Sequence, residues 1–176
     1  MKKYKAIAIP VTFAEGKPRF LTVRDRRFKD WIFVTGGCRR REVFNPLRCA
    51  LRELEEETRG VICLKKGEYT EFKFTVKENI TTELIYNVFI FFVDYSRNDQ
   101  YTLIKKFYDE KQKTQVKKQN KQPIKKTFDE NDYMSFDTLE EFNTRKKWSR
   151  IDENIIKNPE FYACVSSMNR KTFSIK

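Results

Sequence analysis

Short apolar runs separated by turn-forming residues predict β-strands along much of the chain. The segment Glu15-Gly16-Lys17-Pro18 separates the first two runs, and a hairpin turn is expected around Asn79. A strongly apolar run, Val88-Phe89-Ile90-Phe91-Phe92-Val93, is typical of a buried strand. We therefore expect strands at residues 5–13, 19–24, 31–34, 68–76, 82–94 and 132–136.

Capping signals place helices between these strands. Asn45-Pro46 and Asn158-Pro159 each join a capping residue to a proline suited to the first helical turn. Residues 137–141 carry a capping-box pattern. We expect one helix from residue 46 to a left-handed cap at Gly60, one from 138 toward 147, and one from 159 to about 168. The order of elements predicts a mixed α/β fold, and 176 residues suit a single domain, 1–176.

Acidic residues gather on one face of the first expected helix, within Arg52-Glu53-Leu54-Glu55-Glu56-Glu57. Residues three and four apart share a helix face, so Glu53, Glu56 and Glu57 converge while Glu55 points elsewhere. Carboxylates this close repel one another unless a cation neutralises them. Their oxygens, without sulfur or imidazole, are ligands that suit Mg²⁺ or Mn²⁺. The pattern favours a divalent-metal site over the alternative, a solvated acidic face in which Arg52 pairs with Glu56.

Composition narrows the chemistry further. The chain has no histidine, which excludes His-dependent serine or cysteine catalysis and His-liganded zinc. Four cysteines lack Cys-x-x-Cys spacing and are expected to be reduced thiols, with Cys38 a candidate for reactivity. No signal region and no apolar span of about 18 residues occurs, so we expect a soluble, cytoplasmic protein without a membrane partner.

Basic residues are concentrated in two places. Residues 104–126 contain nine lysines and only Asp109 and Glu110 as acids, which accounts for more than half of the net charge of +12. This Lys-rich insertion is expected to be a mobile loop or a fraying helix. Its functional interpretation is contact with an RNA backbone or another polyphosphate, and the alternative is a solubility insertion. Arg39, Arg40 and Arg41 form a second basic group beside the acidic helix and are candidates for substrate contact.

The segment 36–60 resembles the Nudix box, G-x5-E-x7-R-E-U-x-E-E-x-G-U with U an apolar residue. Gly36 and Glu42 match its opening, and the segment 52–57 matches R-E-U-x-E-E. Two departures occur: nine residues instead of seven separate Glu42 from Arg52, and Arg59 stands where glycine is usual, with Gly60 following. The first departure leaves the role of Glu42 open.

This resemblance implies an α/β/α sandwich and a Mg²⁺- or Mn²⁺-dependent pyrophosphohydrolase. It implies that Glu53, Glu56 and Glu57 bind metal, that Glu53 is an alternative proton acceptor, and that Arg52 orients the carboxylates. Gly36 and Gly37 would present backbone to metal or substrate. A further carboxylate is expected before the last helix, with Asp132 the first choice and Glu130 the second.

The substrate expected from this resemblance is a nucleotide with a diphosphate linkage. The basic, Lys-, Phe- and Asn-rich chain is also similar to Nudix proteins of large DNA viruses, among which decapping enzymes hydrolyse the mRNA cap. Capped RNA is therefore one candidate partner, and no DNA specificity is inferred. Small nucleotides, diphosphoinositol polyphosphates and a non-catalytic RNA-binding role on the same scaffold are the alternatives.

Overall fold

Seven strands form one mixed sheet in a computed structural model that describes residues 1–65 and 67–175, with side chains up to Met168. The hydrogen-bonded order is β3-β2-β1-β6-β5, with β4 added to β1 and β7 added to β2. β1 and β6 are parallel over ten residue pairs, whereas the other pairings are antiparallel. The strands are β1 Lys2–Thr12, β2 Arg19–Asp25, β3 Trp31–Ile32, β4 Val34–Gly37, β5 Tyr69–Lys77, β6 Glu83–Phe92 and β7 Asn131–Asp137.

The predicted strands are confirmed, with one division. The run at 31–34 forms two short strands, because Trp31 and Ile32 pair with β2 whereas β4 pairs with β1. Phe33 lies between them and is fully buried. β4 therefore carries Gly36 and Gly37 beside β1, ahead of the acidic helix.

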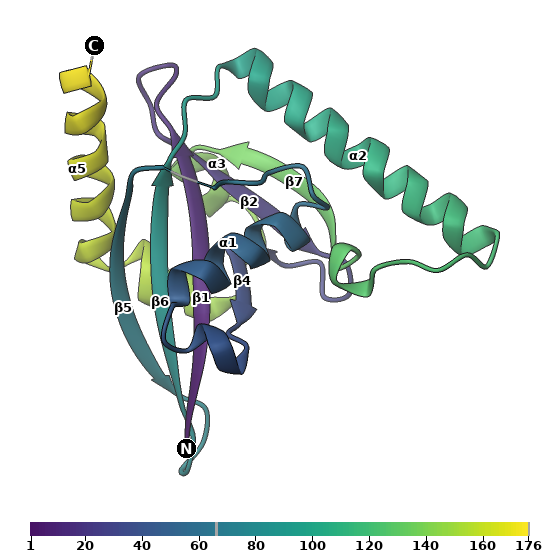
Figure 1. Cartoon of the computed structure of the whole chain (residues 1–176). Coiled ribbons are helices and arrows are strands. Elements are labelled where there is room, and N and C mark those ends of the chain that lie inside the picture. The colour runs from purple at the N-terminus through teal and green to yellow at the C-terminus, as the bar shows by residue number, and fades with distance from the viewer. Residues whose placement is uncertain (66, 176) are drawn as a thin grey trace.

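Helices cover both faces of the sheet (Figure 1). The described helices are α1 Pro46–Glu57, α2 Arg97–Gln119, α3 Leu139–Asn143, α4 Ser149–Ile151 and α5 Pro159–Ile175. Short helical turns occur at Arg40–Glu42, Lys126–Phe128 and Asp152–Ile156. The helix predicted from residue 138 begins with Thr138 as its cap but ends at Asn143, short of Lys147. The last helix begins at Pro159 as predicted and continues past residue 168.

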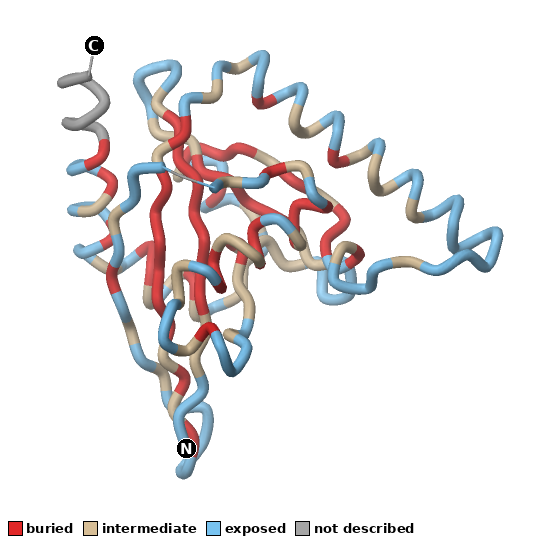
Figure 2. The backbone as a smooth tube through the Cα atoms, in the orientation of Figure 1, coloured by how far each residue is buried: buried red, intermediate tan, exposed pale blue. Residues whose placement is uncertain are grey.

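Two hydrophobic cores lie on opposite faces of the sheet. Successive side chains of a strand point to opposite faces, and β1 contributes to both cores. Ala6 and Ala8 belong to the core that contains the buried side of α1, whereas Ile7 and Ile9 belong to the core that contains α5. The residues of β1 in the interior are therefore buried without alternation, as Figure 2 shows along the central strands. The layers confirm the predicted α/β/α arrangement.

The Lys-rich insertion is mainly a regular helix rather than a loop. α2 begins well before it, at a capping box in which Ser96 and Asp99 exchange side-chain-to-backbone hydrogen bonds of 3.1 and 3.0 Å. Phe107 is fully buried and anchors the helix to the core. Beyond it α2 extends outward past the sheet (Figure 1), and the chain returns through the linker that leads into β7. Among the described helices, none is long and apolar enough to cross a membrane.

Candidate active site

The acidic helix α1 is held at both ends by the residues that the sequence indicates. The side-chain oxygen of Asn45 accepts a hydrogen bond from the backbone N–H of Arg48 at 3.4 Å, and Pro46 occupies the first helical position. At the other end Arg59 and Gly60 both have positive φ angles, 58° and 77°. The predicted left-handed cap therefore involves two residues, one of which is not glycine.

Arg52 joins the carboxylates of the motif. Its guanidinium donates two hydrogen bonds of 2.8 Å to Glu42, one of 2.9 Å to Glu53 and one of 3.1 Å to Glu56. It also donates to the carbonyl oxygen of Gly37 at 3.1 Å. Glu42 is buried, and its hydrogen bonds with Arg52 lower the pKa of this carboxyl to about 2. The longer loop therefore still delivers Glu42 to Arg52, as a partner that fixes the guanidinium.

Gly36 is required for space rather than for its backbone angles. It lies in β4 with an ordinary negative φ, beside the carboxylate of Glu53. A Cβ atom at this position would lie 1.9 Å from the Cδ atom of Glu53. Nothing lies within 4 Å of a Cβ atom built on Gly37, whose contribution is the carbonyl bond to Arg52. Of the two predicted glycines, Gly36 alone requires the absence of a side chain.

Glu57 and Glu53 lie in surroundings that disfavour negative charge. Burial raises the pKa of Glu57 well above its usual range, and the charges of Glu53 and Glu130 raise it further. Burial also raises the pKa of Glu53, although Arg52 partly opposes this shift. Glu57 accepts a hydrogen bond of 3.3 Å from the side-chain amide of Asn131. The nearby cationic groups therefore do not fully neutralise the negative charge of these two buried carboxylates.

Glu130 faces this acidic group, whereas Asp132 does not. The pKa of Glu130 is raised by partial desolvation, although the residue stays exposed, and by the charges of Glu56 and Asp25. Asp132 instead accepts two hydrogen bonds from Arg24, at 2.9 and 2.8 Å, and one from Lys29 at 2.6 Å. The second-choice acid from the sequence is thus beside the site, and the first choice lies in a separate ion pair.

Two residues that the sequence analysis missed support the site. Asn131 donates from its side chain to the carbonyl oxygen of Glu57 at 3.2 Å as well as to its carboxylate. Arg59 is buried and donates to the carbonyl oxygen of Asn131 at 2.7 Å and to Asp129 at 3.1 Å. The sequence feature that could have indicated a special role for Arg59 is its position in the motif, where a glycine is usual. Arg59 ties the end of α1 to the start of β7.

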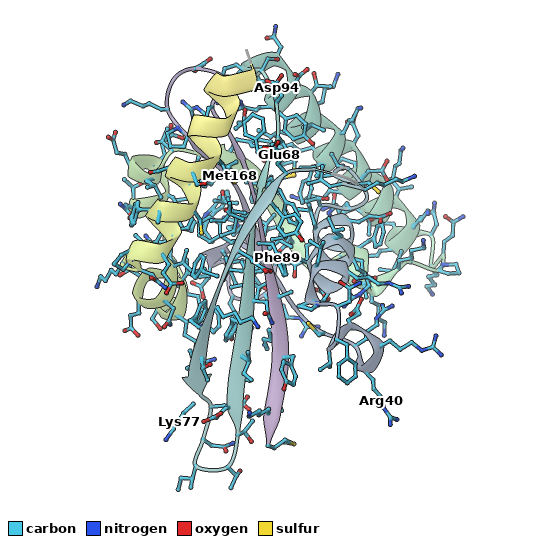
Figure 3. The ribbon with its side chains drawn as sticks, turned by 60° about the vertical axis from the view of Figure 1, so that its left-hand side comes forward. Arg40, Glu68, Lys77, Phe89, Asp94 and Met168 are labelled. Carbon is cyan, nitrogen blue, oxygen red and sulfur yellow. The ribbon has the colours of Figure 1, made fainter. Side chains whose placement is uncertain are left out.

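The three arginines after the glycines differ in their contacts. Arg39 lies 3.4 Å from a carboxylate oxygen of Glu56. Arg40 and Arg41 are exposed, and within the described residues no ion pair involves their side chains. Arg40 projects away from the body of the protein in Figure 3. Cys38 is half-buried, and a hydrogen bond with Cys49 lowers the pKa of its thiol.

A cavity of about 340 Å³ opens beside Glu57 and Glu130. Apolar side chains form part of its wall: Phe28, Ile32 and Trp148. We call it the aromatic cavity. A pocket lined by both apolar and acidic side chains can accept a ligand that combines a flat ring with polar groups.

The donor chemistry of the acidic group fits a hard divalent cation. Glu53, Glu56, Glu57 and Glu130 supply only carboxylate oxygens, and desolvation and mutual repulsion raise the pKa of three of them. Within the described residues, no group of three or more such side chains is arranged to hold a metal ion as it stands. Arg52 occupies one oxygen of Glu53 and one of Glu56. A cation would therefore bind with rearrangement of these side chains.

Comparison with known proteins agrees with the motif. The family model of the NUDIX domain matches residues 2–158. No curated protein matches the chain significantly.

Solved structures share the fold at low sequence identity. The NUDIX domain of Shewanella oneidensis NrtR, complexed with ADP ribose, superposes with a TM-score of 0.55 at 10% identity, covering 85% of this chain and 81% of that one. A NUDIX hydrolase from Listeria monocytogenes gives 0.52 at 13% identity, with 86% and 95% covered. The Ap4A hydrolase of C. elegans, in a binary complex, gives 0.50 at 13% identity, with 85% and 90% covered.

Proposed function

We propose that the chain, which belongs to the Nudix family, is a pyrophosphohydrolase that cleaves a nucleoside-diphosphate-linked substrate with the help of Mg²⁺ or Mn²⁺. The observation that carries this proposal is the arrangement around Arg52. One guanidinium holds three carboxylates of the motif, next to Glu57, whose pKa is raised by burial and by neighbouring negative charge. Such a concentration of negative charge is stabilised when a cation binds.

Each residue of the site has a defined task in this proposal. Glu53, Glu56 and Glu57 hold the cation, and Glu130 takes the place first assigned to Asp132 as the further carboxylate. A bound divalent ion supplies a water of lowered pKa and polarises the phosphate. Arg52 orients Glu53 and Glu56, and Gly36 leaves room for the Glu53 carboxylate. Glu53 serves either as a ligand or as the acceptor of the proton from the attacking water.

The preferred substrate is capped RNA, hydrolysed within the cap, as in the viral branch that the sequence resembles. The strongly basic chain supports a polyanionic substrate. ADP ribose and Ap4A, named with two structural relatives, each contain adenosine linked through a phosphoanhydride. Arg39, Arg40 and Arg41 are proposed to contact the substrate, and only Arg39 already contacts a motif carboxylate. Small nucleotides and diphosphoinositol polyphosphates are the alternative substrates.

Turnover against a substrate panel tests this function. Capped RNA, the free cap dinucleotide, nucleoside triphosphates, Ap4A, ADP ribose and a diphosphoinositol phosphate are each incubated with the metal-free protein and with Mg²⁺ or Mn²⁺. We expect no product without metal, and release of a nucleoside diphosphate from capped RNA when metal is added. Tight RNA binding without turnover of any substrate in either metal would contradict the proposal and favour the non-catalytic alternative.

A further inference from the structure

A second cavity adjoins the proposed active site and has a different character. It has a volume of about 500 Å³ and shares three lining residues with the aromatic cavity: Asp25, Phe28 and Glu130. Its other lining residues are Arg26, Arg27, Lys118, Ile124, Lys126 and Asp129. We call it the basic cavity. Because Glu130 lies at the boundary, a substrate at the acidic group can extend into either cavity.

The wall of the basic cavity has a surplus of positive charge available to a ligand. Asp129 is already paired with Arg59, with Arg26 and with Lys118. Hydrogen bonds from Lys118 and Arg59 outweigh the effect of burial and hold the pKa of Asp129 below its usual range. Arg27 and Lys126 line the same cavity, and neither lies within 4.0 Å of a carboxylate oxygen of a described residue, although the charge of Arg27 acts on Glu130. They are the two cationic groups that an incoming anion can neutralise.

The turn that carries Arg27 is already ordered. The carboxylate of Asp25 accepts hydrogen bonds from the backbone N–H groups of Arg27 and Phe28, at 2.8 and 2.7 Å. The backbone N–H of Lys29 donates to the carbonyl oxygen of Asp25 at 3.0 Å. Phe28 is held at the boundary of the two cavities with 71% of its surface exposed. Because the backbone of this turn is already ordered, ligand binding costs little additional backbone conformational entropy there.

We propose that the basic cavity binds the phosphodiester chain of a substrate whose phosphoanhydride lies at the acidic group. The nucleoside at the near end occupies the aromatic cavity, and Phe28 provides a surface on which a base of the chain stacks. Arg27 and Lys126 contact successive phosphates. This inference rests on the proposed function and deepens it, because it selects a nucleotide with a single-stranded RNA tail over an isolated nucleotide.

Part of the Lys-rich insertion has a structural role in this proposal. Lys118 is engaged with Asp129, which Arg59 links to the end of α1. α2 therefore positions the linker that carries Lys126 and Glu130, and its outward lysines are not the tail contacts. A matched pair for comparison is Lys106 and Lys117, which are exposed on α2, line neither cavity and form no ion pair within the described residues.

The test compares the double substitution Arg27→Gln/Lys126→Gln with the control Lys106→Gln/Lys117→Gln, which changes the net charge equally. The probes are a cap dinucleotide and the same cap carrying a ten-nucleotide single-stranded RNA. We expect KM to rise for the tailed substrate only, and only in the cavity variant. Binding of the tailed RNA is measured by fluorescence anisotropy in Ca²⁺ at several salt concentrations.

Counterion release sets the size of the effect. Loss of two phosphate contacts should flatten the log–log salt slope by about 1.4, so the affinity ratio of wild type to variant grows roughly 25-fold between 1 M and 0.1 M salt. Equal weakening by the control pair, or no weakening by the cavity pair, overturns the inference. An equal loss on the tailless dinucleotide also overturns it, because the cavity would then serve the reaction centre. Anisotropy tests the inference even if no substrate is turned over, which would instead refute the proposed function.

Discussion

The carboxylates of α1 and those at the start of β7 show how one residue type takes two roles. On α1, Arg52 is shared among Glu42, Glu53 and Glu56, and burial raises the pKa of neighbouring Glu57. At β7, Asp132 has two cations for a single carboxylate. Burial alone would raise the pKa of Asp132, but hydrogen bonds from Arg24 and Lys29 outweigh it and bring the pKa to about 2.

The two groups differ in their balance of charge and not in the presence of acids, and this difference supports the proposed cation site at α1. A carboxylate whose oxygens are satisfied by Arg and Lys gains little from a metal ion. Carboxylates that share one guanidinium and repel one another gain much more. The comparison therefore supports the proposal that the α1 group binds the cation, and it predicts a stabilising role for Asp132.

The largest expected effect follows substitution of Glu57. Glu57→Gln keeps the volume of the side chain but removes one proposed metal ligand, so turnover should fall by about 100-fold or more, equivalent to roughly 3 kcal/mol of transition-state stabilisation. The same change removes a buried charge whose pKa is raised in the folded state, so the metal-free protein should unfold at a higher urea concentration than wild type. Steady-state kinetics and urea unfolding measure the two quantities.

Glu55→Gln is the matched control, because Glu55 lies on the same helix but is exposed and faces away from the acidic group. It should leave both turnover and unfolding close to wild type. Equal losses of activity in the two variants would show that general helix charge, and not the position of Glu57, matters. A destabilised Glu57→Gln variant would show that Glu57 is a structural carboxylate.

Substitution of Asp132 is expected to lower the stability of the fold, in contrast to substitution of Glu57, and to leave turnover unchanged. Asp132→Asn should lower the free energy of unfolding at pH 7 by about 1–2 kcal/mol, the lower value reflecting the half-exposed Lys29. Because the folded-state pKa is depressed from 3.8 to about 2, this contribution is complete above the unfolded value and is lost as pH falls through about 2. Urea unfolding between pH 7 and pH 2 should show the difference from wild type shrinking, with turnover at pH 7 retained. A loss of turnover in a stably folded Asp132→Asn variant would restore Asp132 to the site.

Much of this site could be predicted from the sequence because its signals are local. Helical spacing brings Glu53, Glu56 and Glu57 together, and Asn45-Pro46 marks the start of their helix. It is harder to predict from the sequence which of two nearby acids at a strand end, Glu130 or Asp132, faces the site. The pairing of β2 and β7 shifts register between Arg24 and Asp25, so that Tyr133 and Asn131 have partners and Asp132 is the additional residue of a bulge. Simple alternation of side chains therefore cannot predict the direction of Asp132.

The α2 helix shows a second limit. Ser96 and Asp99 give a local start signal, but most of the following residues are charged or polar, which made a loop an equally good prediction. Its position depends on Phe107, buried against distant parts of the chain, and on the pairing of Lys118 with Asp129. The role of Arg59 could not be predicted from local sequence either, because its partners Asp129 and Asn131 lie about 70 residues away along the chain.

Direct measurement of Mn²⁺ binding tests the central claim that the α1 carboxylates, and not Asp132, form the cation site. Isothermal titration of Mn²⁺ into folded wild-type, Glu57→Gln and Asp132→Asn proteins at pH 7 compares the two regions without requiring a substrate. We predict saturable binding of similar affinity in the wild type and in Asp132→Asn, and strongly weakened binding in Glu57→Gln. Undiminished binding in Glu57→Gln, or its loss in Asp132→Asn alone, would contradict the account.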